Sequence, residues 1–346
     1  MCRALLRRKC GNVFAQYAKI VKPVFRHAIR FDVSAPQKSR SCTLSQTVEK
    51  NRGLRYNKIM KINNEWKDYE IIATGDGEKL ERWGNVVLLR PDPQVIWHAA
   101  KPLDKIVRPD ARYLRSSSGG GHWEYNKPVP DEWHVSWRDL TFAVKPMGFK
   151  HTGLFPEQAA NWATMIDLIR GANRPINVLN LFAYTGGATV ACLSAGASVC
   201  HVDAAKNMVE RCRENVALSG LTDRPVRYIV DDCRKFVKRE INRGRRYDAI
   251  IMDPPSYGRG SNGEVWKIEE DICDFVDLCA GVLSDNPLFV LINSYTTGLQ
   301  PAVLSNILKR SIPGADKATV EAYEVCLPTD EGGVVLPCGA SGLITF

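Results

Sequence analysis

The run Asp253-Pro254-Pro255-Ser256-Tyr257 is the strongest chemical signal in the chain. It directly follows Tyr247–Met252, a mostly apolar run that is typical of a buried strand. Two prolines fix the backbone and prevent a helix from starting, so we expect the Asp253 carboxylate and the proline carbonyls to be held as rigid acceptors. Tyr257 follows where its ring could stack on a planar substrate. The run therefore predicts a site that orients a flat molecule by hydrogen bonding and stacking.

Acidic residues follow two other predicted strands. Asp203 comes 23 residues after Asn180, and a carboxylate there could accept hydrogen bonds from both hydroxyls of a ribose. The alternative is that Asp203 caps the helix predicted over 205–219. Asp231 and Asp232 follow the next strand, where an acid could bind an adenine amino group. Capping of the following helix is equally compatible with one of these two.

The turn within Leu179–Ala188 carries Gly186 and Gly187 where a strand gives way to a helix. Glycines at such a turn allow the backbone to approach a ligand closely, although an ordinary helix start that contains glycine has the same pattern. The spacing is not G-x-G-x-x-G, so it does not specifically predict binding of a dinucleotide.

Strands and helices alternate after residue 150, which predicts a parallel sheet covered by helices on both faces, with the ligand at the carboxyl ends of the strands. The predicted strands are Ile176–Phe182, Ser198–Val202, Val226–Val230, Tyr247–Met252 and Leu288–Ile292. The predicted helices are Gln158–Ile169, Ala188–Ala195, Lys206–Ser219 and Ile268–Leu283.

The sequence pattern before this region is different: residues 68–150 carry short β-rich runs separated by turn residues such as Gly75-Asp76-Gly77. This pattern predicts a small antiparallel β module with hairpin turns. The runs are Tyr69–Ala73, Val86–Leu89, Val95–His98 and Leu140–Val144. We therefore divide the chain into a leader (1–59), a β module (60–150) and an α/β domain (151–346).

The net charge of +9 comes from the leader, in which 14 Lys and Arg accompany only two acids. Residues 60–346 hold 33 bases and 36 acids, so the basic balance of the chain does not argue for RNA or DNA binding. An Arg-rich, acid-poor leader is typical of a transit peptide. The alternative is an upstream over-extension of the gene, because Met60 directly precedes the patterned region. We expect the leader to be disordered and leave it out of the fold.

The cysteine count of 11 is odd, and the chain has no C-x-x-C pair or zinc-type spacing. This usage favours a reducing compartment and a cytoplasmic enzyme, or an organelle matrix if the leader is a transit peptide. Six scattered histidines argue against a metal site. No apolar stretch approaches the ~20 residues of a membrane span.

Taken together, the motifs NLFAYTGG, HVDAA, VDDCRKF and MDPPSYGRG, with HTGLFPEQAANW upstream and GEVWKIEED downstream, resemble those of class I S-adenosylmethionine-dependent methyltransferases. The most similar group is the bacterial one related to the large-subunit rRNA cytosine methyltransferases, and the resemblance covers about residues 68 to 346. It implies a Rossmann-like α/β fold with a seven-stranded sheet in the order 3-2-1-4-5-7-6. Glu321–Leu327 and Ser341–Phe346 are candidates for its final antiparallel hairpin.

The resemblance also implies S-adenosyl-L-methionine as cofactor and a role for each matching residue. Asp203 would hold the ribose, Asp232 the adenine, and Asp253 with Pro254 would lie next to the methyl group. The other implied cofactor-binding residues are Tyr184, Thr185 and Gly186 in the first turn, with Asn180 before it, and Phe155, Glu157 and Gln158 in the segment that covers the cofactor. Asn180 and Phe182 stand where the general family has an acid and a glycine.

One departure bears on the reaction. The cytosine C5 relatives carry a nucleophilic cysteine after the fifth strand, where this chain reads Ile292-Asn293-Ser294-Tyr295. We therefore expect direct methyl transfer to an RNA base, in rRNA, with Asp253, Pro254 and Tyr257 as the catalytic residues and a nitrogen as the acceptor. Arg234, Arg259 and Lys267 are candidates for phosphate contacts or plain surface charges. The rival interpretations are an NAD-type oxidoreductase and a non-catalytic RNA-binding module.

Overall fold

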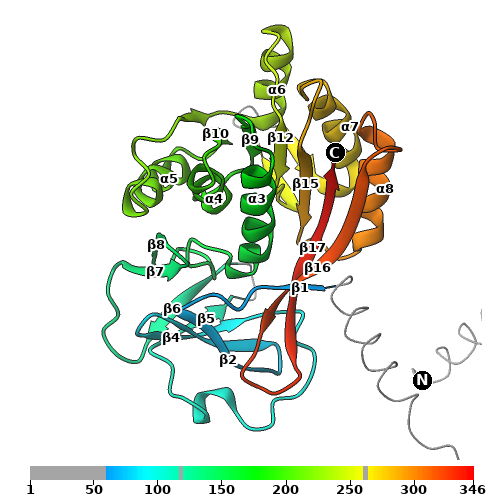
Figure 1. Cartoon of the computed structure of the whole chain (residues 1–346). Helices are drawn as coiled ribbons and strands as arrows, with labels where there is room; N and C mark the ends of the chain where they lie inside the picture. The colour runs from blue at the N-terminus through cyan, green and yellow to red at the C-terminus, as the bar shows by residue number, and fades with distance from the viewer. Residues whose placement is uncertain (1–59, 117–119, 260–263) are drawn as a thin grey trace, which may run out of the picture. The chain divides into compact units, whose positions relative to one another are not determined.

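The computed structural model describes residues 60–116, 120–259 and 264–346. The predicted leader, 1–59, lies outside the described residues. The described chain forms a large mixed sheet covered by helices, with smaller β-sheets built from the residues before 150 (Figure 1).

The large sheet has the order β1-β16-β17-β15-β12-β9-β10-β11. Counted from the β11 edge, the first seven strands (β11, β10, β9, β12, β15, β17 and β16) follow the predicted order 3-2-1-4-5-7-6. Strand β17 is antiparallel to both neighbours, as expected for the final hairpin. The sequence did not predict β1, an eighth strand that pairs in parallel with β16 at the edge. The strands are β1 (Met60–Ile62), β9 (Asn177–Leu181), β10 (Ser198–Asp203), β11 (Val226–Val230), β12 (Ala249–Met252), β15 (Phe289–Ser294), β16 (Thr319–Pro328) and β17 (Val335–Thr345).

The central strands are apolar on both faces, so each face is buried under helices. Val178 and Ile251 belong to one core with side chains of α3, α4 and α5, whereas Leu179 and Ile250 belong to a second core with α6, α7 and α8. Figure 1 shows these two helical layers on opposite faces of the sheet. The helices are α3 (Ala159–Gly171), α4 (Gly187–Ser194), α5 (Lys206–Leu218), α6 (Cys233–Asn242), α7 (Ile268–Ala280) and α8 (Pro301–Ser311), with short 3-10 helices η1 (Leu103–Lys105) and η2 (Pro156–Gln158).

The β module has a five-stranded sheet in the order β2-β3-β4-β5-β6 and a separate β7-β8 hairpin. The predicted turn joins β2 to β3, with Asp76 and Gly77 both at positive φ as a two-residue hairpin requires. All pairs are antiparallel except β4 with β5, which the sequence did not predict. The strands are β2 (Tyr69–Gly75), β3 (Glu78–Trp83), β4 (Val86–Pro91), β5 (Ala111–Arg115), β6 (Gly121–Tyr125), β7 (Trp133–Trp137) and β8 (Leu140–Val144).

The prediction of a strand over Val95–His98 is wrong. Val95 is fully buried, which explains the apolar pattern, but the backbone of this stretch bonds to a turn rather than to a strand. The carbonyls of Val95 and Trp97 accept the N–H groups of Gly77 and Asp76 at 2.8 Å. The stretch is therefore a loop that packs against the β2–β3 turn.

The β module contacts the large sheet and its helices at several points. The Trp66 indole donates to the Pro156 carbonyl at 3.0 Å, and the Gln94 amide donates to the Cys338 carbonyl of β17 at 2.9 Å. Ile71 forms a parallel bridge with Thr329 beyond β16. These contacts bring the β module against the segment that leads into α3. The domain boundary at residue 150 stays a prediction.

Candidate active site

A pocket of about 470 Å³, its open mouth included, lies at the carboxyl ends of β9, β12 and β15. This is the edge at which parallel α/β sheets bind ligands. Six of the residues predicted from the sequence line it: Phe155, Gln158, Asn180, Tyr184, Thr185 and Asp253. Pro254, Tyr257, Gly186, Asp203 and Asp232 are not among the lining residues.

The loop after β9 forms one wall of the pocket and holds two residues in a left-handed conformation. Phe182 has φ of 54° and Tyr184 has φ of 50°, values that disfavour any residue with a Cβ by about 1–2 kcal/mol. The backbone N–H of Tyr184 donates to Asp203 Oδ2 at 2.8 Å, and the Phe182 ring packs 5.3 Å from Trp266. Packing and hydrogen bonding therefore hold a strained loop, which is a feature of functional sites.

The two glycines of this turn are explained by packing. A Cβ on Gly186, which has φ of 85°, would lie 2.2 Å from Cys212 Sγ of α5, and one on Gly187 would lie 2.4 Å from the Trp162 ring of α3. The close approach that the sequence predicted is thus to neighbouring helices. Gly187 lines the pocket as well, while the predicted cofactor contact of Gly186 stays a prediction.

Asp203 lies at the end of β10 and is not the cap of the next helix. Its Oδ1 accepts the N–H of Ala205 and its Oδ2 accepts the N–H of Tyr184, both at 2.8 Å, whereas the N-cap of α5 is Ala205. Burial raises the pKa of this carboxyl, and the two backbone N–H groups oppose the rise. Each oxygen retains a lone pair, so the carboxylate can still accept hydrogen bonds from a ligand.

Asp232 caps α6, which is the alternative that the sequence left open. Its Oδ1 accepts the N–H of Lys235 at 2.8 Å. Its neighbour Asp231 forms an ion pair with Arg239. The capping geometry leaves the other oxygen of Asp232 available, so its predicted contact with adenine stays a prediction.

Asp253 is the ionisable group with the most altered environment in the pocket. Burial, as the larger cause, and the charge of the Glu157 carboxyl raise the pKa of Asp253 to about 7. A hydrogen bond from Asn293 acts in the opposite direction. Burial also raises the pKa of Glu157. A carboxyl with a pKa near neutrality can gain or lose a proton at working pH, which is what acid–base chemistry requires.

The residues after Asp253 depart in part from expectation. The Pro255 carbonyl accepts the Trp266 indole N–H at 2.7 Å, so the expectation that both proline carbonyls serve the site is wrong for Pro255. Pro254 is buried. Tyr257 begins β13 (Tyr257–Arg259), which pairs with β14 (Val265–Lys267), and its ring is 52% exposed. Its hydroxyl accepts a hydrogen bond from Arg259 Nε at 2.9 Å.

Sequence reasoning assigned no role to Asn293 and Tyr295, which complete the aromatic and amide groups around the pocket. The Phe155 ring lies 5.5 Å from Tyr184 and 5.6 Å from Tyr295 between ring centroids. Asn293 lines the pocket, and the Gln158 amide donates to the Tyr295 hydroxyl at 2.7 Å. Asn293 lies near the end of β15 and Tyr295 directly follows it, in the stretch where the sequence showed only that a cysteine is missing.

Among the described residues that line this pocket there is no cysteine. Cys233 approaches the site, with its Sγ accepting the Phe182 N–H at 3.3 Å, but burial raises the pKa of its thiol well above the ordinary value. Cys279 is buried as expected, whereas Cys273 is exposed, contrary to the expectation that both pack against the sheet. The eight cysteines in the described ranges are free thiols.

Within the part of the chain that the structure describes, no group of three or more His, Cys, Asp and Glu side chains is arranged to hold a metal ion. Likewise, none of the described helices is long and apolar enough to cross a membrane.

Several known proteins are similar to this chain. A crystallised S-adenosylmethionine-dependent methyltransferase from Agrobacterium tumefaciens is 31% identical, with a TM-score of 0.78 over 83% of this chain and 93% of that one. A putative methyltransferase from Streptococcus mutans is 18% identical over 89% of this chain and 83% of that chain, and its TM-score of 0.63 supports the fold.

Curated relatives are large-subunit rRNA methyltransferases. The K/L enzyme of Shewanella frigidimarina is 28% identical over 194 residues, which are 55% of this chain and only 25% of that protein. The K enzyme of Neisseria meningitidis is 24% identical over 255 residues, 69% of this chain and 71% of that protein. This chain thus spans about a quarter of the length of the Shewanella relative.

The profile of the S-adenosylmethionine-dependent methyltransferase family matches residues 90–276, more than half of the chain. The match includes the loop after β9, the Asp203 strand end and the Asp253 run. It excludes the NAD-type oxidoreductase and the non-catalytic module as interpretations. The chain belongs to the S-adenosylmethionine-dependent methyltransferases.

Proposed function

We propose that this methyltransferase transfers a methyl group directly to a nitrogen of an RNA base, in rRNA, without a covalent enzyme–RNA intermediate. The observation that carries the proposal is the Asp253 carboxyl in a pocket whose described lining contains Asn293 and no thiol. Attack by carbon 5 of cytosine needs a thiolate that first adds to carbon 6. A nitrogen acceptor needs only a hydrogen-bond acceptor for its proton and correct orientation.

The residues around the pocket fit the cofactor of this family. Its sulfur carries a positive charge and the methyl group to be transferred. The rings of Tyr184 and Tyr295 each lie within 6 Å of the Phe155 ring, and aromatic rings attract cations. The Asp253 carboxylate adds a negative charge at the same wall. On the other side of the loop, Asp203 offers the acceptors that suit ribose hydroxyls.

Asp253 would act on the acceptor base in two ways. Its carboxylate accepts a hydrogen bond from the exocyclic amine and so orients the nitrogen lone pair toward the methyl group, a proximity effect. As the nitrogen–carbon bond forms and the carbon–sulfur bond breaks, the nitrogen must lose a proton. A carboxyl with a pKa of about 7 can receive it.

RNA is proposed as the substrate because the curated relatives are named as rRNA methyltransferases. On this chain, the exposed ring of Tyr257 is available to stack on an extruded base. Arg259 adjoins it. The other candidate phosphate contacts are engaged: Arg234 pairs with Asp271 at 3.0 Å and Lys267 pairs with Glu270 at 2.8 Å. We therefore assign the phosphate contact to Arg259.

The free cysteines of the described residues support a separate proposal, that the enzyme works in a reducing, cytoplasmic-type compartment.

The test is transfer of a tritiated methyl group from S-adenosylmethionine to purified rRNA, tRNA and total protein. We expect label in the rRNA fraction with the wild-type enzyme and at least a hundredfold less with Asp253→Ala. Label in the protein fraction alone would overturn the RNA assignment. Equal labelling by Asp253→Ala would overturn the role of Asp253.

A further inference from the structure

A buried cluster of uncharged polar side chains lies behind the pocket wall. We call it the amide network, and its members are Gln158, Asn161, Asn293, Tyr295, Tyr323 and Ser341. They come from η2, α3, β15, β16, β17 and the residue after β15. Asn161, Asn293, Tyr323 and Ser341 are at most 3% exposed, so their polar atoms depend on one another for hydrogen bonds. Asn161 does not line the pocket, whereas Gln158 and Asn293 do.

Asn161 is the centre of this network. The Tyr323 hydroxyl donates to Asn161 Oδ1 at 2.7 Å, so the amide nitrogen faces the opposite way. That nitrogen lies 2.9 Å from Gln158 Oε1, 3.1 Å from Asn293 Oδ1 and 3.0 Å from Ser341 Oγ. One side chain thus meets two residues of the pocket wall.

These contacts fix the orientation of Asn293. Its Oδ1 accepts from Asn161 Nδ2 and also from the Ser341 hydroxyl at 2.8 Å. An amide carries its oxygen and nitrogen on opposite branches, so the Asn293 nitrogen is turned away from both donors. It donates to Gln158 Oε1 at 3.1 Å. A second hydrogen bond, between Asn293 and Asp253, lowers the pKa of the Asp253 carboxyl.

We infer that Asn161 is a positioning residue for methyl transfer: it holds the Asn293 amide so that an N–H, and not the carbonyl oxygen, faces Asp253. The inference rests on the proposed role of Asp253. Without Asn161 only the hydrogen bonds with Ser341 and Gln158 hold the Asn293 side chain, so the donor to Asp253 is less firmly fixed. The Asp253 carboxylate is then harder to form and less well oriented toward the acceptor.

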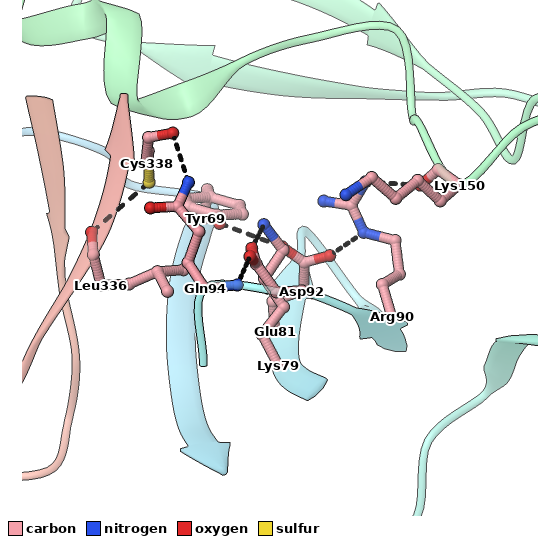
Figure 2. A network of polar contacts seen from close by, with 9 residues as sticks. All are labelled: Tyr69, Lys79, Glu81, Arg90, Asp92, Gln94, Lys150, Leu336 and Cys338. Carbon is pink, nitrogen blue, oxygen red and sulfur yellow. Dashed lines mark hydrogen bonds and ion pairs between the residues drawn. The ribbon is translucent and has the colours of Figure 1, made fainter. Parts of the chain in front are cut away.

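The charged surroundings of Asp253 must be separated from this effect. In addition to burial, the Glu157 carboxyl, from η2, raises the pKa of Asp253, and both carboxyls raise the pKa of the Tyr295 phenol. Lys79, a hydrogen bond from Tyr295, and Arg90 act to lower the pKa of Glu157. Figure 2 shows that Lys79 and Arg90 belong to a second network, in which they pair with Asp92 and Glu81. Within the described residues neither of these two ion pairs is hydrogen-bonded to Asn161 or Ser341, so Asn161→Ala and Ser341→Ala leave both pairs intact.

The experiment compares the free energy of unfolding of the protein with and without Asp253→Asn, from about pH 5 to pH 9. The pH at which the stability difference develops reports the pKa of Asp253. Adding Asn161→Ala to both proteins should move this midpoint up by about one pH unit, because the ionised form loses a hydrogen bond. Ser341→Ala, which removes one donor to Asn293, should move it in the same direction by about half as much.

Ile166→Val is the matched control: Ile166 is a buried residue of α3 whose aliphatic side chain cannot hydrogen-bond to the network, so the midpoint should stay unchanged. An unmoved midpoint in both network variants would show that Asn161 only packs. If Asn161→Ala does not fold, Ser341→Ala alone decides. No acceptor is needed, so a wild-type enzyme that fails to methylate RNA would overturn the proposed function and leave this result standing.

Discussion

Replacing Asp253 by Asn should stabilise the folded protein above neutral pH while abolishing its activity. Asp253 has a folded-state pKa of about 7 against its ordinary value of 3.8. A carboxyl with a raised pKa favours the fold when it is protonated, and this contribution is lost as the pH rises through the folded pKa. The full shift corresponds to about 4 kcal/mol. Asn keeps the shape and the acceptor oxygen of Asp without its charge.

Because Asp253 is only half-buried, solvent screens part of this effect. We expect the stability advantage of Asp253→Asn to grow by about 1–2 kcal/mol between pH 5 and pH 8. Urea unfolding followed by tryptophan fluorescence, without cofactor, measures it. Asp167→Asn removes a charge from the exposed face of α3 and serves as the control. A pH-independent advantage for Asp253→Asn would refute our interpretation of its environment.

Three further predictions concern the cofactor, the leader and the thiols. Asp203→Ala should weaken S-adenosylmethionine binding by about 1.5–3 kcal/mol in calorimetry, through loss of charged hydrogen bonds; unchanged affinity in a folded variant would rule out the ribose role. A chain that begins at Met60 keeps β1 and should bind the cofactor like the full chain, whereas one that begins at Asp68 should unfold at a lower temperature. A large loss of stability on truncation to Met60 would mean that the leader contributes to the fold. With RNA that contains 5-fluorocytidine, we expect no denaturation-resistant protein–RNA adduct; an adduct that disappears on substitution of one cysteine, such as Cys233, would restore the cytosine C5 mechanism.

The regular alternation of apolar strands and amphipathic helices after residue 150 predicted a parallel sheet with helices on both faces, and the family resemblance implied the strand order. Predicted ends such as Lys206–Ser219 lie within a residue or two of the observed α5. The sequence did not predict β1, since three residues carry no periodicity and their pairing depends on a strand more than 250 residues away. The loop at Val95–His98 was misread because burial of Val95 has the same pattern in a strand and in a packed loop.

A pocket residue could be predicted from the sequence where a single motif shows both the strand end on which the residue lies and the reactive group it carries, as at Asp253. It was not predictable where a role depends on a partner. Asp232 and Asp203 look alike in the sequence, yet one caps a helix and the other holds the N–H of Tyr184. Asn161 is an ordinary helix residue until the fold brings it to Asn293, 132 positions later in the chain.

The most direct test of the account is the identity of the methylated nucleoside. Labelled rRNA from the transfer reaction is digested to nucleosides and separated by chromatography with mass detection. We predict a base methylated on nitrogen, formed by the wild-type enzyme and absent with Asp253→Asn. Formation of 5-methylcytidine by the wild-type enzyme would contradict direct transfer to nitrogen beside Asp253.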